Sequence, residues 1–140
     1  MASIFSRIIR GEIPAAKIYE DDLTFAFLDI NPASRGHTLV ICKEELPGLL
    51  DLSPELLAAV TRTTQIVTRA LVETLQPDGF NLIQNNGKAA GQVVFHFHVH
   101  IIPRWEGDGA VRGWRPGTTS SEELRELANQ IAAHVVRVAL

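Results

Sequence analysis

Apolar residues recur at helical spacing in three segments of the chain. The first covers residues 3–10, where they lie three or four positions apart and Gly11 follows as a stop signal. The second begins at Ser53, an N-cap residue with proline after it, and should end before Pro77. A capping-box pattern opens the third, over residues 120–138. We expect short helices near both ends of the chain and one long central helix.

Four further segments have the composition of β-strands. Residues 24–30 and 37–41 are separated by turn-forming residues and are predicted to form a hairpin. Residues 80–85 and 93–103 are predicted to form a second pair of strands, joined by a glycine-containing loop. Strands and helices in this mixture predict an α+β fold.

The size and composition of the chain indicate one soluble domain over residues 1–140. Hydrophobic residues make up 46% of the sequence and charged residues 21%, as in ordinary globular domains. The net charge of −3 provides no general positive field, so a nucleic acid polymer is not an expected partner. Cys42 is the single cysteine, and no segment has the roughly 20 consecutive apolar residues of a membrane span. These features favour a cytoplasmic protein that does not bind membranes.

Three of the five histidines, His96, His98 and His100, occupy alternate positions. Side chains in a strand alternate between its faces, so in the predicted strand over residues 93–103 the three imidazoles would share one face. A single buried histidine is commonly structural, but three in a row must each find hydrogen-bond partners. The pattern therefore points to a chemical function for this strand.

Two kinds of chemistry suit such a row. Metal binding is one, but at about 3.3 Å per residue the outer two histidines lie roughly 13 Å apart, so a metal would take two of them with His37 or Asp29. Nucleophilic catalysis is the other: the central imidazole attacks while its second nitrogen is held and the flanking rings position substrate oxygens. Phosphorus is the expected electrophile, and the glycines of residues 85–92 would let backbone N–H groups approach an anion.

Residues 96–102, His-Phe-His-Val-His-Ile-Ile, resemble the signature of the histidine-triad (HIT) family of nucleotide hydrolases and transferases. Other segments resemble the family in the same order, and the likeness covers roughly residues 3–104. These segments are residues 4–9, 27–30 and 36–41, Gly91-Gln92 before the triad and Pro103-Arg104 after it.

The resemblance implies a HIT-like fold, with a five-stranded antiparallel sheet, a long helix and short N- and C-terminal helices. It also implies a homodimer that pairs the long helix and a sheet edge with their copies. His98 would be the nucleophile that becomes transiently nucleotidylated, with its other ring nitrogen oriented by the backbone carbonyl of His96. His100 and His37 would contact the phosphate and the leaving group.

A nucleoside pocket is also implied by the resemblance. Its apolar residues would enclose the base and Asp29 would bind the ribose hydroxyls, although core packing explains the apolar residues equally well. Asn85 favours the Hint branch, which cleaves phosphoramidates, over the Fhit branch, which cleaves dinucleoside polyphosphates. The implied residues are Phe5, Ile8, Ile13, Phe27, Asp29 and Ile30 around the nucleoside, and Asn85, Gly91, Gln92 and Val93 near the phosphate.

The sequence departs from the family pattern in two places. Val93 replaces a serine whose hydroxyl touches the phosphate in the Hint pattern. Ser3, Ser6 and Glu45 stand where many bacterial relatives have two cysteines and a histidine, which hold a structural zinc ion together with the first triad histidine. Hydroxyls and a carboxylate are poor replacements for thiolate and imidazole ligands of zinc. We therefore expect no structural metal, and no cofactor.

The leading hypothesis is a hydrolase that cleaves purine nucleoside 5′-phosphoramidates and related adenylates at the α-phosphorus through a nucleotidyl-histidine intermediate. Its ligand would be a purine mononucleotide or a nucleotide conjugate. Three alternatives remain open. They are a dinucleoside polyphosphate hydrolase, a nucleotide-binding adaptor with weak activity, and a metalloenzyme that uses two of the triad histidines.

Overall fold

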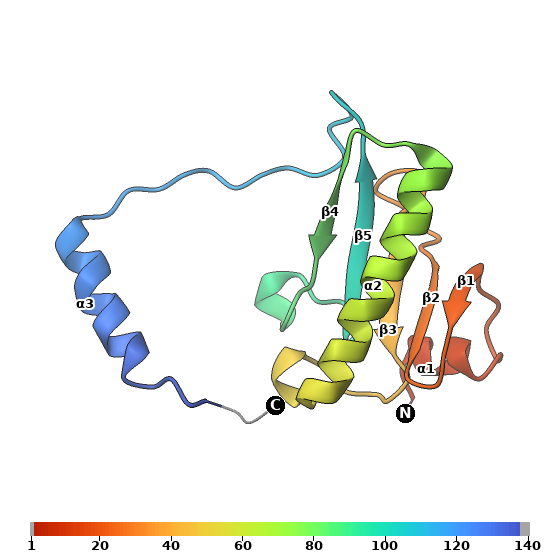
Figure 1. Cartoon of the computed structure of the whole chain (residues 1–140), viewed down its shortest axis with the longest axis horizontal. Helices are drawn as coiled ribbons and strands as arrows, with labels where there is room; N and C mark the ends of the chain where they lie inside the picture. The colour runs from red at the N-terminus through yellow and green to blue at the C-terminus, as the bar shows by residue number, and fades with distance from the viewer. Residues whose placement is uncertain (1, 138–140) are drawn as a thin grey trace. The chain divides into compact units, whose positions relative to one another are not determined.

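The computed structural model describes residues 2–137, and the chain divides into two compact units, Met1–Ala110 and Val111–Leu140 (Figure 1). All residues of the two hydrophobic cores belong to the first unit. In the second unit, helix α3 (Ser121–Ala132) has no buried residue. The sequence predicts a single domain over residues 1–140, and this extent stays a prediction.

The first unit is built on a five-stranded antiparallel sheet in the order β1-β2-β3-β5-β4. This confirms the sheet that the family resemblance implies. The sequence pattern located four of the strands and missed β1, which is short, lies at the edge and has no buried residue. The strands are β1 (Lys17–Glu20), β2 (Thr24–Leu28), β3 (Thr38–Cys42), β4 (Gly79–Ile83) and β5 (His98–Arg104).

The long helix α2 (Pro54–Leu75) covers one face of the sheet (Figure 1). Its first turn is capped as predicted, because the Ser53 side chain accepts a hydrogen bond from the Leu56 N–H. Apolar residues on one side of α2 pack against inward-pointing residues of the central strands, such as Val60 and Val67 with Ala26 and Val40. This face forms the larger of the two cores.

The opposite face of the sheet is covered by the short helix α1 (Ile4–Ile9). Phe5 is its one buried residue and packs with Phe25, Phe27 and Leu39. Because neighbouring residues of a strand point to opposite faces, β2 supplies Ala26 to the core under α2 and its two phenylalanines to the core under α1. Both faces of the central strands are therefore buried.

Strand β5 begins at His98, five residues later than the sequence predicts. Residues 93–97 are held by loop contacts in place of the sheet ladder: the Phe97 N–H donates to the Leu46 carbonyl at 2.7 Å, and the Gln92 side chain donates to the Pro47 carbonyl at 2.6 Å. His96 therefore lies outside the strand, and the expectation of three histidines on one strand face is wrong. Only two of them belong to β5.

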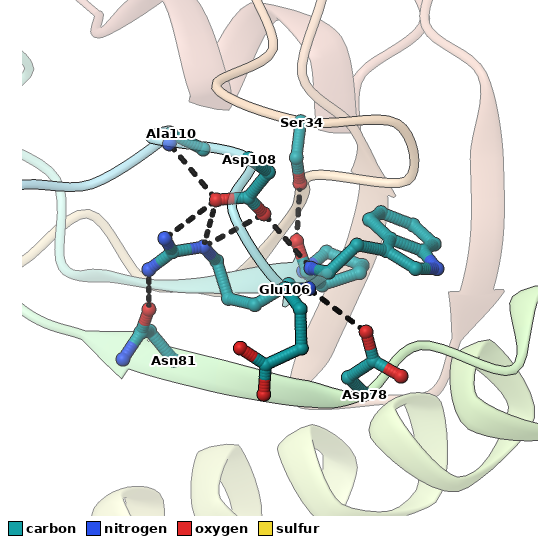
Figure 2. A network of polar contacts seen from close by, with 9 residues as sticks. Ser34, Asp78, Asn81, Glu106, Asp108 and Ala110 are labelled. Atoms are coloured by element: carbon teal, nitrogen blue, oxygen red, sulfur yellow. Dashed lines mark hydrogen bonds and ion pairs between the residues drawn. The ribbon is translucent and has the colours of Figure 1, made fainter.

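A polar network fixes the chain where it leaves β5 (Figure 2). Arg104 donates to the Asp108 carboxylate from Nε and Nη2 and to Asn81 from Nη1. The same carboxylate accepts the N–H groups of Trp105 and Ala110. The guanidinium of Arg104 and these N–H groups lower the pKa of Asp108, so this carboxylate stays ionised. Residues 104–110 form a turn held by charge-assisted bonds.

Helix α3 begins where the sequence predicts but is shorter than predicted. Ser120 caps α3 by accepting from the Glu123 N–H, and the helix ends at Ala132. The predicted end at Val138 lies outside the described residues. No helix among residues 2–137 is long and apolar enough to cross a membrane.

Candidate active site

A cavity of about 410 Å³ opens on the α1 side of the sheet, at the start of β5. Its volume falls within the roughly 300–1,000 Å³ of typical small-molecule sites. Two histidines, His98 and His100, line it together with Asp29. No lysine or arginine is among its lining residues, so an anion would be bound by neutral donors.

The apolar residues that the sequence predicts for a nucleoside pocket all line this cavity. They come from α1, from the segment after it and from the end of β2, and Phe5 and Phe27 lie edge-on to each other with ring centroids 5.6 Å apart. Phe5 and Phe27 are core residues that also line the cavity, whereas Ile30 is 86% exposed and belongs to neither core. The predicted residues are Phe5, Ile8, Ile13, Phe27 and Ile30.

His98 is oriented by a hydrogen bond to the backbone. Its Nδ1 lies 2.7 Å from the carbonyl oxygen of His96, and because a carbonyl can only accept, Nδ1 carries the proton. In a neutral ring, Nε2 then holds a free lone pair, and no described residue forms a hydrogen bond with it. The ring is 7% exposed and packs edge-on against Phe5. His98 thus presents a nucleophilic nitrogen at the cavity.

His96 lies beneath the site rather than in it. The ring is fully buried, and Nε2 donates to the carbonyl of Cys42 at 2.6 Å. Its Nδ1 therefore accepts, and the Ser3 hydroxyl lies 2.8 Å away. Both ring nitrogens are occupied, so His96 contributes through its backbone carbonyl and not through its imidazole.

His37 and His100 form a hydrogen-bonded pair beside His98. The Ala33 N–H donates to Nδ1 of His37 at 2.9 Å, so the proton of the neutral His37 ring lies on Nε2. That nitrogen is 2.9 Å from Nδ1 of His100, which must accept and therefore carries its own proton on Nε2. His100 lines the cavity, so the chain from Ala33 through His37 leaves an N–H donor next to the lone pair of His98.

The turn before His37 is shaped to place that ring. Gly36 has φ of +87°, and a Cβ atom there would overlap the Leu75 side chain and crowd Pro103. The Ser34 hydroxyl donates to the Pro103 carbonyl at 2.6 Å, which ties the same turn to β5 (Figure 2). Glycine is therefore required at residue 36 for both backbone and packing reasons.

Asp29 joins this group from the end of β2. Its Oδ1 accepts the Asn31 N–H at 2.8 Å, while Oδ2 lies 3.6 Å from Nε2 of His37. Asp29, His37 and His100 are the one group among the described residues that could hold a metal ion, with donor atoms within 4.8 Å of one another. However, the facing nitrogens of His37 and His100 already share a proton, which favours a hydrogen-bonded pair over a metal centre.

The loop before β5 forms the remaining wall of the cavity, which Gly91 and Val93 line. The N–H groups of Gly91 and Gln92 donate to carbonyls within the loop, so they are not free for an anion as the sequence suggests. The N–H groups of Val93 and Val94 form no hydrogen bond with any described residue and are the available donors. The Val93 side chain is 85% exposed.

Two predicted residues of this loop are placed differently from the others. Gln92 is buried, and its amide bridges the Gly87 N–H and the Pro47 carbonyl, so its side chain shapes the loop and does not line the cavity. Asn85 is half-buried and also does not line it, although its amide lies close to Gly91. Sequence reasoning did not assign several other lining residues to the site, which come from α1, β2, β3 and the loops. These are Ile4, Pro14, Ala15, Leu28, Asn31, Leu39 and Val94.

Burial keeps the histidines of the site neutral. It lowers the pKa of His98 and His37 below the ordinary imidazole value. Burial and the neighbouring His98 and His37 lower the pKa of His100 to about 4. A neutral His98 is nucleophilic, and a neutral His100 accepts from His37 while donating from Nε2.

Comparison with known proteins identifies several that are similar to this chain. Residues 10–107 match the sequence profile of the HIT domain. Adenylylsulfatase HINT3 of Arabidopsis thaliana is 49% identical over 105 residues, which cover 75% of this chain and 53% of that protein. Adenosine 5′-monophosphoramidase hnt1 of Schizosaccharomyces pombe is 40% identical over 136 residues, covering 96% and 99%. The crystal structure of a HIT family member from Bacillus subtilis superposes with a TM-score of 0.92 at 35% identity, covering 99% and 100%.

The lowered pKa of His100 predicts a pH-dependent stability. The unfolded chain binds a proton at this residue below about pH 6.5, whereas the folded chain does so only near pH 4. The free energy of unfolding should therefore fall as the pH falls from about 6.5 to about 4. His100→Gln should flatten this slope, as measured by urea unfolding at several pH values.

The exposed His134 provides the control. His134→Gln makes the same substitution at an exposed position outside the cavity lining and should leave the slope unchanged. If the free energy of unfolding of His100→Gln depends on pH as in the wild-type protein, protonation of His100 does not destabilise the folded chain.

Proposed function

This chain belongs to the HIT family, and from that premise we propose that it is a nucleotide hydrolase that cleaves purine nucleoside 5′-phosphoramidates and related adenylates at the α-phosphorus. The observation that carries the proposal is the free Nε2 lone pair of His98 beside the Nε2–H of His100 in one cavity. The printed names of two relatives, an adenosine 5′-monophosphoramidase and an adenylylsulfatase, favour this substrate class.

The first chemical step forms a bond from Nε2 of His98 to the α-phosphorus and breaks the bond from phosphorus to the leaving group. The Nε2–H of His100 donates a hydrogen bond to the departing nitrogen or oxygen, which takes up a proton from solvent as it leaves, because a neutral imidazole that lost this proton would become an anion. The nucleotidylated His98 is a cation, and its Nδ1–H remains hydrogen-bonded to the His96 carbonyl. This bond therefore strengthens as the positive charge develops.

In the second step water completes the hydrolysis. His100 stays neutral, and the water that attacks phosphorus releases its proton to solvent. The bond between phosphorus and His98 breaks, and a nucleoside monophosphate is released. Both histidines return to their starting protonation states, so the cycle needs no cofactor.

The nucleoside half of the substrate would occupy the apolar end of the cavity. Phe5 and Phe27 would enclose the base, and Oδ2 of Asp29 would accept hydrogen bonds from the ribose hydroxyls. The N–H groups of Val93 and Val94 would bind phosphate oxygens, which replaces the missing serine hydroxyl. In this arrangement the α-phosphorus would lie next to Nε2 of His98.

The proposal predicts that His98→Ala lowers kcat for adenosine 5′-phosphoramidate by at least about 1,000-fold, because it removes the nucleophile. Adenosine 5′-monophosphate binding should remain, since the apolar wall is unchanged. For the wild-type protein, kcat/KM for adenosine 5′-phosphoramidate should exceed kcat/KM for diadenosine tetraphosphate by at least about 100-fold. Steady-state kinetics with both substrates, and calorimetric binding, measure these quantities.

His134→Ala is the matched control and should retain full activity, because His134 is exposed and is not among the residues that line the cavity. Turnover that survives in His98→Ala would contradict the mechanism. A higher kcat/KM for the tetraphosphate would instead support the polyphosphate hydrolase.

Val93 is exposed and stands where the Hint pattern has a serine that touches the phosphate. The missing hydroxyl favours one further candidate, a nucleotide-binding adaptor with weak activity. An adaptor would bind adenosine 5′-monophosphate but turn over neither substrate. The same kinetic and binding measurements on the wild-type protein therefore distinguish it from the enzyme.

We also propose that two copies of the chain form a homodimer through α2 and β4. β4 is an edge strand, and Phe80 and Leu82 on it are 46% and 53% exposed. With Val72 of α2 they line an apolar groove of about 600 Å³. An exposed apolar edge strand is a template for pairing with a second copy.

Leu82→Asp should therefore convert the protein from a dimer to the 15.4 kDa monomer, because it places a charge in the apolar groove. Sedimentation equilibrium measures the mass. Leu50→Asp is the control, since Leu50 is 97% exposed and lies outside the groove. A wild-type protein that is monomeric at about 100 µM would contradict the proposal.

A further inference from the structure

The N-terminus of α1 meets the loop after β3 in a polar cluster of Ser3, Ser6, Glu45 and His96. By the family resemblance, a structural zinc ion would be held at these four positions. The donor set does not fit zinc, because it offers two hydroxyls and a carboxylate in place of two thiolates and an imidazole. His96 provides no free ligand either, since both of its ring nitrogens are hydrogen-bonded.

The hydrogen bonds of this cluster form a complete network. Oε1 of Glu45 accepts the Ser3 N–H at 2.6 Å and the Ser6 hydroxyl at 2.7 Å. The Ser3 hydroxyl accepts the Ser6 N–H at 3.0 Å and donates to Nδ1 of His96. Nε2 of His96 then donates to the Cys42 carbonyl. A continuous chain of hydrogen bonds links Glu45 to β3 through α1 and His96.

We propose that Glu45, Ser3 and Ser6 form a metal-free latch that positions the nucleophile and the nucleoside wall, with Glu45 as its positioning residue. This inference rests on the function proposed above, because the site that the latch serves is the hydrolase site. The latch acts on two parts of that site at once, the helix α1 and the peptide of His96.

The first part is the wall of the cavity. A six-residue helix is too short to be stable alone, and α1 has one buried side chain, Phe5. The Glu45 carboxylate accepts an N–H and a hydroxyl in the first turn, where negative charge also favours the helix. The Ser6 hydroxyl and the Ser3 N–H lower the pKa of Glu45 to about 2, so it accepts as a carboxylate. Glu45 therefore fixes the helix that carries Phe5 to the cavity.

The second part is the orientation of His98. The residue that offers its carbonyl to Nδ1 of His98 has its own ring held between Ser3 and Cys42. The Phe5 ring lies edge-on to both imidazoles, with centroids 5.8 Å from His96 and 5.0 Å from His98. Loss of the latch should loosen these contacts together.

The experiment compares Glu45→Ala with Glu44→Ala. Glu44 is the matched control, because it is also exposed and no described residue forms a hydrogen bond or ion pair with its carboxylate. Glu45→Ala should raise KM for adenosine 5′-phosphoramidate about 10-fold and lower kcat by less than about 3-fold, since the wall moves more than the nucleophile. Glu44→Ala should change neither.

Glu45→Gln provides the conservative rescue. Its amide oxygen can accept the same two hydrogen bonds, so KM should return to within about 3-fold of wild type. A general loss of packing would not be rescued in this way. Ser6→Ala removes only one donor and should raise KM by about 3-fold, which keeps the test decisive if Glu45→Ala does not fold.

Hydrogen–deuterium exchange provides a second readout. Peptides that cover residues 3–10 should exchange faster in Glu45→Ala, while those of α2 should not change. Treatment of the wild-type protein with EDTA should leave KM and the melting temperature unchanged. Equal KM values in Glu45→Ala and Glu44→Ala would overturn the latch, as would one zinc ion per chain bound at this cluster.

Failure of the latch and failure of the proposed function give different results. If the wild-type protein does not turn over the phosphoramidate, the hydrolase is wrong. The latch is then tested by adenosine 5′-monophosphate affinity, which should fall about 10-fold in Glu45→Ala alone. If the wild-type protein is active and Glu45→Ala is unaffected, the latch alone is wrong.

Discussion

The hydrogen bond from Nδ1 of His98 to the carbonyl of His96 is the interaction on which the whole site depends. It fixes the ring tautomer and directs a lone pair to the cavity, and in the proposed mechanism it would balance the charge of the nucleotidylated imidazole. The bond requires a peptide that points its carbonyl at the histidine two residues further along the chain. That requirement explains why residues 93–97 are held by loop contacts before β5 joins the sheet.

The four histidines of the site divide the work because their surroundings differ. His96 is closed in by hydrogen bonds on both nitrogens, whereas His98 keeps one nitrogen free. The Ala33 N–H donates to Nδ1 of His37, so Nε2 of His37 donates to Nδ1 of His100. A backbone donor therefore determines which nitrogen of His100 carries a proton. Burial then keeps the rings neutral, which suits both a nucleophile and a hydrogen-bond donor.

The sequence predicts most of this architecture because its patterns are local. Helical spacing located α1 and α2, and two of the three histidines of the motif, His98 and His100, line one cavity. Strand alternation failed at His96, since loop hydrogen bonds across more than 40 residues of sequence override it there. The edge strand β1 has few apolar residues, so the sequence pattern did not reveal it. Helix α3 has no buried residue, so its end could not be predicted from apolar spacing. The latch at Glu45 depends on contacts distant in sequence, and only the absence of zinc ligands hinted at it.

Long-range ¹H–¹⁵N correlation NMR of the histidine rings tests the central claim about His98 most directly. Near pH 7 the predicted spectrum has a protonated Nδ1 and a lone-pair-bearing Nε2 for His98, with the signals assigned by their loss in His98→Gln. A spectrum with the proton on Nε2, or with both nitrogens protonated, would contradict the assignment of His98 as the nucleophile.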